Sequence, residues 1–212
     1  MSTKDCLNVT PCGVISITAP DVTYYARWSI NTYTVTWQNY NGTILEIDEN
    51  VEYETTPTYN GKTPTKTGYT FAGWTGTGLG SATQTVTIAK GSTGNRTYTA
   101  TWTAITYTIK FNGNGNTGGS MSNQTMTYDK AANLTANGFS KTGYTFAGWA
   151  TSASGAVAHT DGKSVSNLTA TANGTVTLYA VWTRDTYTIT YNLNGGTVAT
   201  ANKTTYTIET AT

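Results

Sequence analysis

Short runs of alternating apolar and polar residues recur along this chain at nearly fixed intervals. In one run, an aromatic or leucine, an alanine and a tryptophan occupy every second position, and its copies end at Trp28, Trp102 and Trp182. A second run has threonine or lysine between its apolar residues, and its copies begin at Tyr33, Tyr107 and Tyr187. Successive side chains of a strand point to opposite faces, so each run predicts a strand with one face in a core.

Asn-Gly turn signals follow each copy of the second run, at residues 41–42, 112–115 and 194–196. Asparagine and glycine adopt the positive φ angles that tight hairpin turns require. Each strand is therefore expected to fold back onto a second one, whose shared positions are Val51, Met126 and Tyr206. The polar segments that follow, 54–66 and 129–141, predict a short helix or an irregular crossover.

The seven residues Gly-Tyr-Thr-Phe-Ala-Gly-Trp occur twice, at 68–74 and 143–149, and an exact recurrence of this length marks an array of one small module. Strict alternation would place Phe71 and Trp74 on opposite faces of a strand. A β-bulge at Gly73, and likewise at Gly148, would turn the tryptophan back toward the phenylalanine. A further alternating strand is expected at 84–88 in the first module.

The repeats divide the chain into five segments. We expect an N-terminal tail at 1–20, the closing strand of a preceding module at 21–30, module 1 at 31–104, module 2 at 105–183 and a partial module 3 at 184–212. The linkers 29–32, 103–106 and 183–186 are short and are not rich in glycine or proline. Such linkers are not flexible tethers, so the modules should form a semi-rigid rod.

The repeated motifs, taken in order, resemble the Listeria–Bacteroides repeat, also called the internalin B-repeat. The resemblance covers about residues 21–212 and rests on the Tyr-Thr-Val-Thr-aromatic run, the Asn-Gly turn, Gly-Tyr-Thr-Phe-Ala-Gly-Trp and the closing Leu-Tyr-Ala-Val-Trp. It implies a mainly β fold of tandem small β-grasp-like (ubiquitin-like) modules, with the helix reduced or absent. It also implies tandem use in secreted or wall-attached bacterial proteins, and it carries no catalytic residues over to this chain.

The tryptophans and the other large aromatics at repeat positions are interpreted as core. A module of about 75 residues has few other large side chains to bury, and each buried aromatic removes about 150–250 Å² from water. Stacking of exposed aromatics on sugars is the alternative. The expected core residues are Trp28, Trp37, Phe71, Gly73, Trp74, Trp102, Phe111, Phe146, Gly148, Trp149, Trp182 and Tyr191.

Composition narrows the class of protein further. Charged residues make up 11% of the chain and the net charge is +1, so the clustered basic residues of a nucleic-acid-binding surface are missing. No apolar stretch approaches the roughly 20 residues of a membrane span. The first residues lack the apolar core of a secretion signal. For an extracellular or cell-surface protein, that start predicts a fragment of a longer chain or another export route.

Three features resemble reactive or ligand-binding sites, but each has a simpler explanation. Residues 113–118 match the dinucleotide pattern G-x-G-x-x-G without an expected helix, so a hairpin loop is favoured. The acidic residues at 48–54, together with Asp129 and Asp161, are interpreted as solvated charges rather than as paired catalytic carboxylates or a calcium site. His159, the only histidine, is expected in a surface loop.

Cys6 and Cys12 leave two alternatives open, a local disulfide or two free thiols. A zinc site would need two more ligands, and none lies near them. We therefore expect no metal, no cofactor and no enzymatic activity.

The sequence supports one main functional hypothesis and two alternatives. The main hypothesis is a stalk or adhesin spacer of a bacterial cell-surface protein, whose partners are neighbouring repeats of the same or another chain. The first alternative is a module that binds a glycan or a host protein. The second is a fibre subunit, joined to its neighbours by strand complementation between its incomplete end modules.

Overall fold

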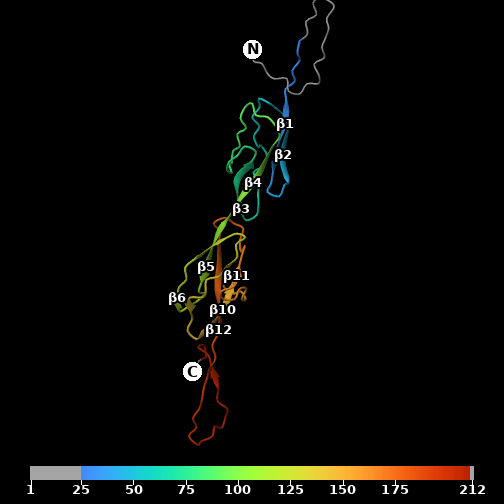
Figure 1. Ribbon diagram of the computed structural model, residues 1–212. Coiled ribbons are helices and arrows are strands. Elements are labelled where there is room, and N and C mark those ends of the chain that lie inside the picture. The colour runs from blue at the N-terminus through green and yellow to red at the C-terminus, as the bar shows by residue number, and fades with distance from the viewer. Residues whose placement is uncertain (1–24, 211–212) are drawn as a thin grey trace, which may run out of the picture.

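The computed structural model describes residues 25–210 of the 212-residue chain. The N-terminal tail with Cys6 and Cys12, and the first residues of the predicted closing strand, lie outside this range. The described residues form strands, turns and irregular segments with no helix, which confirms the mainly β prediction. Modules 1 and 2 follow each other end to end along one elongated axis (Figure 1).

Module 1 contains one four-stranded sheet with the strand order β2-β1-β4-β3. The two central strands, β1 and β4, are parallel, while β2 and β3 pair antiparallel with them at the edges. The first and last strands of the module therefore lie side by side, as in a β-grasp sheet. The strands span Thr32–Gln38 (β1), Ile44–Glu52 (β2), Tyr69–Gly76 (β3) and Arg96–Ala104 (β4).

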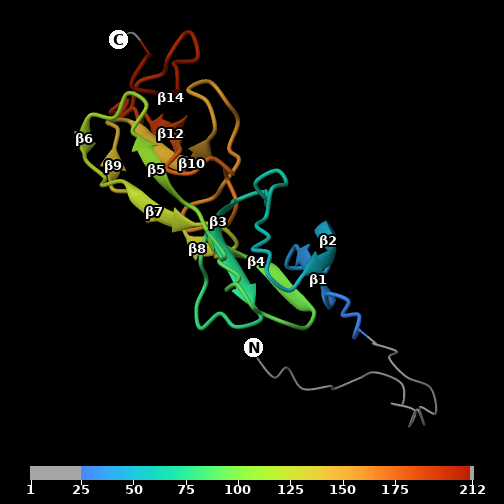
Figure 2. The same cartoon turned by 90° about the horizontal axis from the view of Figure 1, so that it is seen from above.

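Module 2 repeats this sheet, with the order β10-β12-β5-β7 and a parallel central pair of β5 and β12. Its main strands span Thr106–Asn112 (β5), Gln124–Thr127 (β7), Tyr144–Ala150 (β10) and Thr175–Arg184 (β12). Two short pairs are added at its sides. They join β6 (Gly118–Gly119) to β9 (Phe139–Ser140) and β8 (Ala132–Asn133) to β11 (Ser164–Val165). Viewed from above, β1 and β2 lie well apart from β5, β10 and β12 (Figure 2).

The segment after module 2 forms only a small hairpin within the described residues. Its strands are β13 (Tyr187–Thr188) and β14 (Thr205–Tyr206), which pair antiparallel. Tyr187 lies opposite Tyr206, just as Tyr107 lies opposite Met126 in module 2 and Tyr33 lies opposite Val51 in module 1. The three segments therefore begin with the same strand pairing.

The predicted tight hairpin forms in module 1 but takes a different course in module 2. Gly42 has a φ of 82°, and the turn before it closes β1 onto β2. In module 2 the turn at Asn114 and Gly115 has the predicted positive φ angles, yet the strand that pairs with β5 begins only at Gln124. The extra residues carry β6, which pairs with β9, so a local turn signal does not determine how soon the partner strand follows.

The predicted β-bulge in the Gly-Tyr-Thr-Phe-Ala-Gly-Trp strand is confirmed in both modules. The strand register shifts between Phe71 and Gly73, and the two rings of Phe71 and Trp74 pack edge-on with their centres 5.3 Å apart. Module 2 shows the same shift before Gly148, with 4.9 Å between the ring centres of Phe146 and Trp149. The bulge puts both aromatic side chains of each copy into one core.

Two expected strands are not formed. Residues 84–88 form no strand, although Val86 and Ile88 are buried as the alternation predicted. Residues 25–31 also form no strand, because the described residues around them provide no pair of neighbouring strands like those that hold β4 and β12. Alternating burial therefore occurs at 84–88 without a hydrogen-bonded ladder, whereas residues 25–31 are exposed throughout.

Each module has its own hydrophobic core. The core of module 1 is centred on Trp37. The ring centres of Trp74 and Tyr98 lie 5.0 and 4.8 Å from that of Trp37. The core of module 2 is centred on Trp149, with Phe111 and Leu178 beside it. No residue belongs to both cores, so the modules are separate packing units joined only at their ends.

Candidate functional site

The predicted core residues fall into three groups by exposure. Four aromatics and both bulge glycines are buried: Trp37, Trp74, Phe111, Trp149, Gly73 and Gly148. Four more aromatics are half-buried and pack against the cores: Phe71, Trp102, Phe146 and Trp182. The remaining two were wrongly assigned, since Trp28 is 67% exposed and Tyr191 is 45% exposed. Within residues 25–210, their segments have none of the neighbouring strands that cover the equivalent residues of modules 1 and 2.

The reactive groups considered from the sequence do not come together. His159 contacts the bulge strand through its backbone, where its carbonyl accepts the Trp149 N–H at 2.8 Å. Asp48 accepts the indole N–H of Trp37 at 3.0 Å. Strand β6, not a helix, follows the glycine-rich turn at 113–116. Within residues 25–210 no three His, Cys, Asp or Glu residues lie close enough together to hold a metal ion.

The structural feature that recurs is the joint between consecutive modules, and this joint is the candidate site. A single residue, Ile105, connects β4 to β5, and its side chain is 5% exposed. Its N–H donates to the carbonyl of Gly68 at 3.0 Å, and its own carbonyl accepts the N–H of Tyr128 at 2.9 Å. The connector is therefore hydrogen-bonded to both modules and cannot act as a free swivel.

Gly68 lets the two modules approach closely at this joint. It has a φ of 76°, and a Cβ atom built on it would lie 2.3 Å from the ring of Tyr128 in module 2. Both its conformation and its contact therefore exclude a side chain. The next residue, Tyr69, packs edge-on against the same Tyr128 ring, with 5.9 Å between the ring centres. The start of the repeated motif is thus an interface between modules rather than part of the core.

A polar clasp completes the first joint. The Tyr69 hydroxyl donates to Asp129 Oδ2 at 2.7 Å, and the Asn167 amide donates to Asp129 Oδ1 at 2.6 Å. Lys66 places its Nζ 3.7 Å from the centre of the Tyr69 ring. The hydrogen bond from Tyr69, with that from Asn167, lowers the pKa of Asp129, and the same Tyr69–Asp129 bond raises the pKa of Tyr69.

The second joint, between module 2 and the C-terminal hairpin, repeats the arrangement with other side chains. The N–H of Asp185 donates to the carbonyl of Gly143 at 2.9 Å, and a Cβ atom built on Gly143 would lie 2.6 Å from Cβ of Ile208. The Tyr144 hydroxyl donates to Glu209, which also pairs with Arg184. The hydrogen bond from Tyr144 lowers the pKa of Glu209, and the charge of Arg184 adds to this shift.

The two joints share one chemical pattern. A Gly-Tyr corner of one module meets an apolar residue and an acid of the next, which are Tyr128–Asp129 in one case and Ile208–Glu209 in the other. Sequence reasoning treated Asp129 as a solvated charge and did not identify this interface. A signal was available, because an acid stands three positions after the shared positions Val51, Met126 and Tyr206 in every copy.

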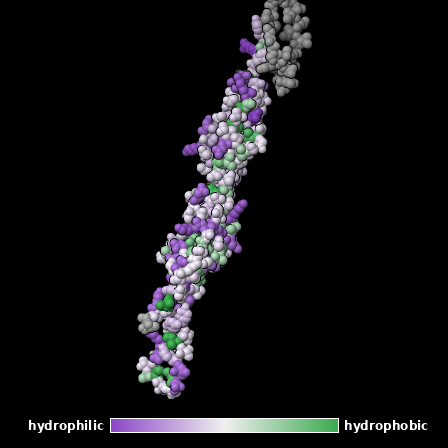
Figure 3. Space-filling model, turned by 90° about the vertical axis from the view of Figure 1, so that its left-hand side faces the viewer, coloured by the Kyte–Doolittle hydropathy of each residue, from purple (hydrophilic) through white to green (hydrophobic). Residues whose placement is uncertain are grey.

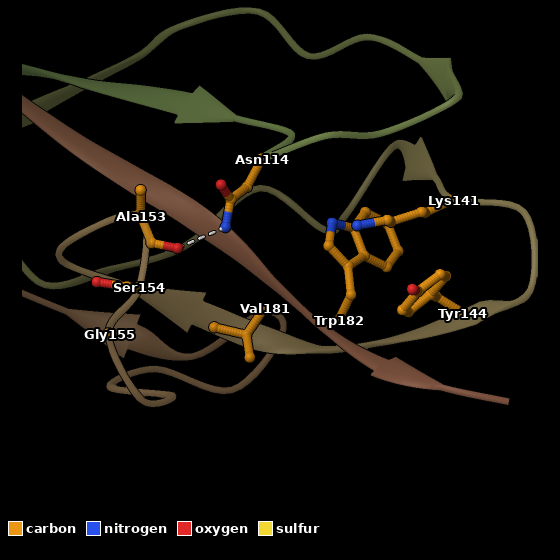
Figure 4. A pocket seen from close by; sticks show the side chains of 8 residues that line it. All are labelled: Asn114, Lys141, Tyr144, Ala153, Ser154, Gly155, Val181 and Trp182. Atoms are coloured by element: carbon orange, nitrogen blue, oxygen red, sulfur yellow. Dashed lines mark hydrogen bonds between the residues drawn. The ribbon is translucent and has the colours of Figure 1, made fainter. Parts of the chain in front are cut away.

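Module 2 also carries a small open cavity beside the second joint, with a volume of about 280 Å³. Figure 4 shows Trp182, Tyr144 and Lys141 on one side of it, and Asn114, Ala153 and Ser154 on the other. Its main polar atoms are already used within the protein. The Asn114 amide donates to the carbonyls of Ala153 and Ala180 at 2.8 and 2.9 Å, and the Trp182 indole N–H donates to that of Gly113 at 2.9 Å.

The aromatic side chains of module 1 are likewise engaged in packing within the protein. A cavity of about 310 Å³ is lined by Trp37, Tyr59, Phe71 and Trp74 among others. However, Trp37 and Trp74 are almost fully buried and pack against Tyr59, so neither presents a flat face to a sugar. The two cavities are therefore weaker candidates for a functional site than the joints.

The fold and the joints define a tandem-repeat protein of small β modules. The sequence profile of the Listeria–Bacteroides repeat domain matches residues 33–101 and 107–181, which is well over half of the chain. The chain therefore belongs to the Listeria–Bacteroides repeat family.

Two relatives come from Evansella cellulosilytica. One, named "Putative membrane protein", is 29% identical over 182 residues, which is 82% of this chain and 24% of the relative. The other, named "Putative Gly-rich membrane protein", is 29% identical over 180 residues, or 81% of this chain and 18% of the relative. The chain thus spans at most about a quarter of these relatives. No helix within residues 25–210 is both long and apolar enough to cross a membrane.

Proposed function

We propose that this chain is a non-enzymatic, extracellular stalk segment of a bacterial cell-surface protein. The observation that carries the proposal is the joint, since Ile105 and the Gly68–Tyr128 contact hold module 1 and module 2 end to end with one connecting residue. The family membership and the much longer relatives, which are named as putative membrane proteins, support the same role. A stalk needs length and stiffness rather than a pocket, and the joints supply both.

Small-angle X-ray scattering of the 212-residue chain tests the stalk. We expect an elongated particle whose maximum dimension changes little with salt, because backbone bonds and a ring contact hold the first joint, and only the second joint adds an ion pair, Arg184–Glu209. A Gly68→Val variant should lose the fixed angle, since its side chain would overlap the Tyr128 ring. A compact particle, or scattering unchanged by Gly68→Val, would contradict the role of the joint.

Surface exposure is tested separately, on cells of the source organism. A protease added to intact cells should release peptides of modules 1 and 2, while a cytoplasmic control protein stays intact. Protection of these peptides until the cells are lysed would refute the extracellular placement. A glycan array with the same chain tests the binding alternative, and specific retention of one glycan class would replace the stalk as the primary role.

Fibre assembly by strand complementation is a second candidate, favoured by the exposed apolar side chains at the C-terminal end. Tyr187, Tyr191 and Tyr206 are 39–45% exposed, whereas their equivalents in module 2, Tyr107, Phe111 and Met126, are buried. Separate hydrophobic residues are also visible on the surface at that end of the space-filling view (Figure 3). A parallel strand with the pattern Tyr-x-Ala-x-Trp would cover them, and residues 24–28 have this sequence.

Light scattering against protein concentration tests this second candidate. Assembly that grows with concentration and is lost on deletion of residues 1–30 would support it. A monomer at every concentration would exclude assembly of this chain and leave the stalk proposal unaffected.

A further inference from the structure

The path of the chain through each module determines how it responds to a pulling force. The chain enters module 1 through β1 and leaves it through β4, and these two strands are parallel neighbours. It enters module 2 through β5 and leaves through β12, again as a parallel pair. Figure 1 shows these strands running roughly along the long axis of the molecule. Tension between the ends therefore acts along the strands.

The parallel pairs are loaded in shear by such a force. Pulling draws β1 toward its N-terminal end and β4 toward its C-terminal end, so the two strands must slide past each other. The bonds of a parallel ladder are evenly spaced along the strands, and they are therefore loaded together. In an antiparallel hairpin pulled from its open end, the bonds break one after another instead.

Further bonds extend each parallel ladder. In module 1 the ladder runs from Val35–Arg96 to Gln38–Thr99, and the Gln38 amide donates to the Thr99 hydroxyl at 3.0 Å. The Thr34 N–H also donates to the Asn95 side chain at 2.9 Å. In module 2, two backbone hydrogen bonds extend the ladder toward the N-terminal ends of β5 and β12. The Thr108 N–H donates to the carbonyl of Gly174, and the Asn173 N–H donates to the carbonyl of Thr106. Each pair is thus held over a stretch longer than its strict register.

We infer that modules 1 and 2 are tension-bearing units, in which the parallel pairs β1–β4 and β5–β12 act as shear clamps connected in series. The connection between the clamps is Ile105 alone, so force passes from β4 into β5 with no slack segment between them. The C-terminal hairpin has no described parallel partner for β13 and should extend first. This inference rests on the proposed stalk role, because only a segment anchored at both ends is pulled.

Single-molecule pulling with two anchor geometries tests the inference. The parent for both has Cys6 and Cys12 replaced by serine. One variant carries anchoring cysteines at Thr32→Cys and Thr103→Cys, which load β1 and β4 in shear. The matched control carries Thr32→Cys and Glu52→Cys, which peel β1 from β2 at register partners. All three positions are exposed, so the anchors leave the core intact.

The expected result is a several-fold higher unfolding force for the shear anchors than for the peeling anchors at the same loading rate. Forced unfolding reports the unfolding rate rather than the equilibrium stability, so equal melting temperatures are compatible with this difference. When the whole chain is pulled, the fully extended length is about 240–270 Å for module 1 and about 260–280 Å for module 2, from ~3.3–3.6 Å per residue. Each unfolding event should lengthen the trace by this value less the span of the folded module.

Equal forces for the two anchor geometries would overturn the inference. So would a whole-chain trace in which modules 1 and 2 extend without separate events. Neither result would affect the stalk proposal, which depends on the elongated shape in scattering and on surface exposure. A compact particle in scattering with a high shear force would reject the stalk and keep the clamps.

Discussion

Replacement of Trp149 by alanine should strongly destabilise module 2 while leaving the stability of module 1 unchanged. Trp149 is 0% exposed, and its ring contacts those of Phe111, Phe139 and Phe146 at centre distances of 4.8, 6.3 and 4.9 Å. A buried aromatic of this size removes about 150–250 Å² from water, worth about 4–6 kcal/mol at ~25 cal/mol per Å². Measured losses for such core truncations are about 3–5 kcal/mol.

That loss is large compared with the stability of one module. At about 0.05–0.15 kcal/mol per residue, a module of this size has about 4–11 kcal/mol. Each kcal/mol lowers the melting temperature of a small domain by about 4–8 °C, so Trp149→Ala should lower that of module 2 by at least about 12 °C. The two modules have separate cores, so module 1 should keep its own transition.

Amide hydrogen exchange in the full chain distinguishes the two modules in one experiment. The amides of β5 and β12 should lose protection in Trp149→Ala, while those of β1 and β4 keep it. Trp28→Ala is the matched control, because the same side chain is removed from a position that is 67% exposed. The packing argument is refuted if Trp149→Ala leaves module 2 protected, or if Trp28→Ala destabilises it equally.

Three further predictions concern the bulge, the joint and the cysteines. Gly148→Ala should destabilise module 2 by more than the ~1–2 kcal/mol of a positive φ alone, since the new Cβ would lie 2.6 Å from Val157 Cγ1. Gly162→Ala, which has a positive φ and open space, is its control, and equal losses in urea unfolding would contradict the clash. At the first joint, hydrogen bonds lower the pKa of Asp129 in the folded state. The stabilisation that the Asp129 charge provides is therefore present at pH values above the unfolded pKa of about 3.9, and it is lost as the pH falls through the folded pKa. Distances between spin labels on modules 1 and 2 should therefore broaden in acid below about pH 4. Tyr69→Phe should show broad distances already at neutral pH, and a parent distribution that stays narrow in acid would count against the clasp. Finally, reduction with dithiothreitol should leave the melting of modules 1 and 2 unchanged, because residues 13–212 contain no cysteine; a lower melting temperature would show that the N-terminal cysteines stabilise them.

Much of each module could be predicted from the sequence because its causes are local. Alternation with a period of two predicts the buried face of β1 and β5, and the positive φ angles at Gly42 and Gly115 follow from Asn-Gly turns. The bulges at Gly73 and Gly148 were also predictable. In each copy, a glycine directly precedes a tryptophan that strict alternation would place on the face opposite the core. These features need no information about distant parts of the chain.

The joints were not predictable in the same way. Tyr69 and Asp129 are 60 residues apart, and although both recur with the repeat, recurrence alone does not show that they meet. Only the tertiary structure brings the Gly68 backbone against Tyr128 and shows why that glycine is needed. The C-terminal hairpin makes the same point, because Ile208 and Glu209 replace Tyr128 and Asp129 while the contact is kept.

The sequence by itself determined the repeat, the β class, the bulged strand and the family. Only the tertiary structure decided the parallel pairing of first and last strands, the contacts at the joints and the exposure of Trp28 and Tyr191. The physical reason is that a strand pattern specifies which face is apolar but not which strand covers it. In the Tyr-x-Ala-x-Trp sequence of β4, which lies between two neighbouring strands, Tyr98 and Ala100 are buried and Trp102 is half-buried. In the earlier copy, Ala26 and Trp28 are exposed, because the described residues provide no such neighbours.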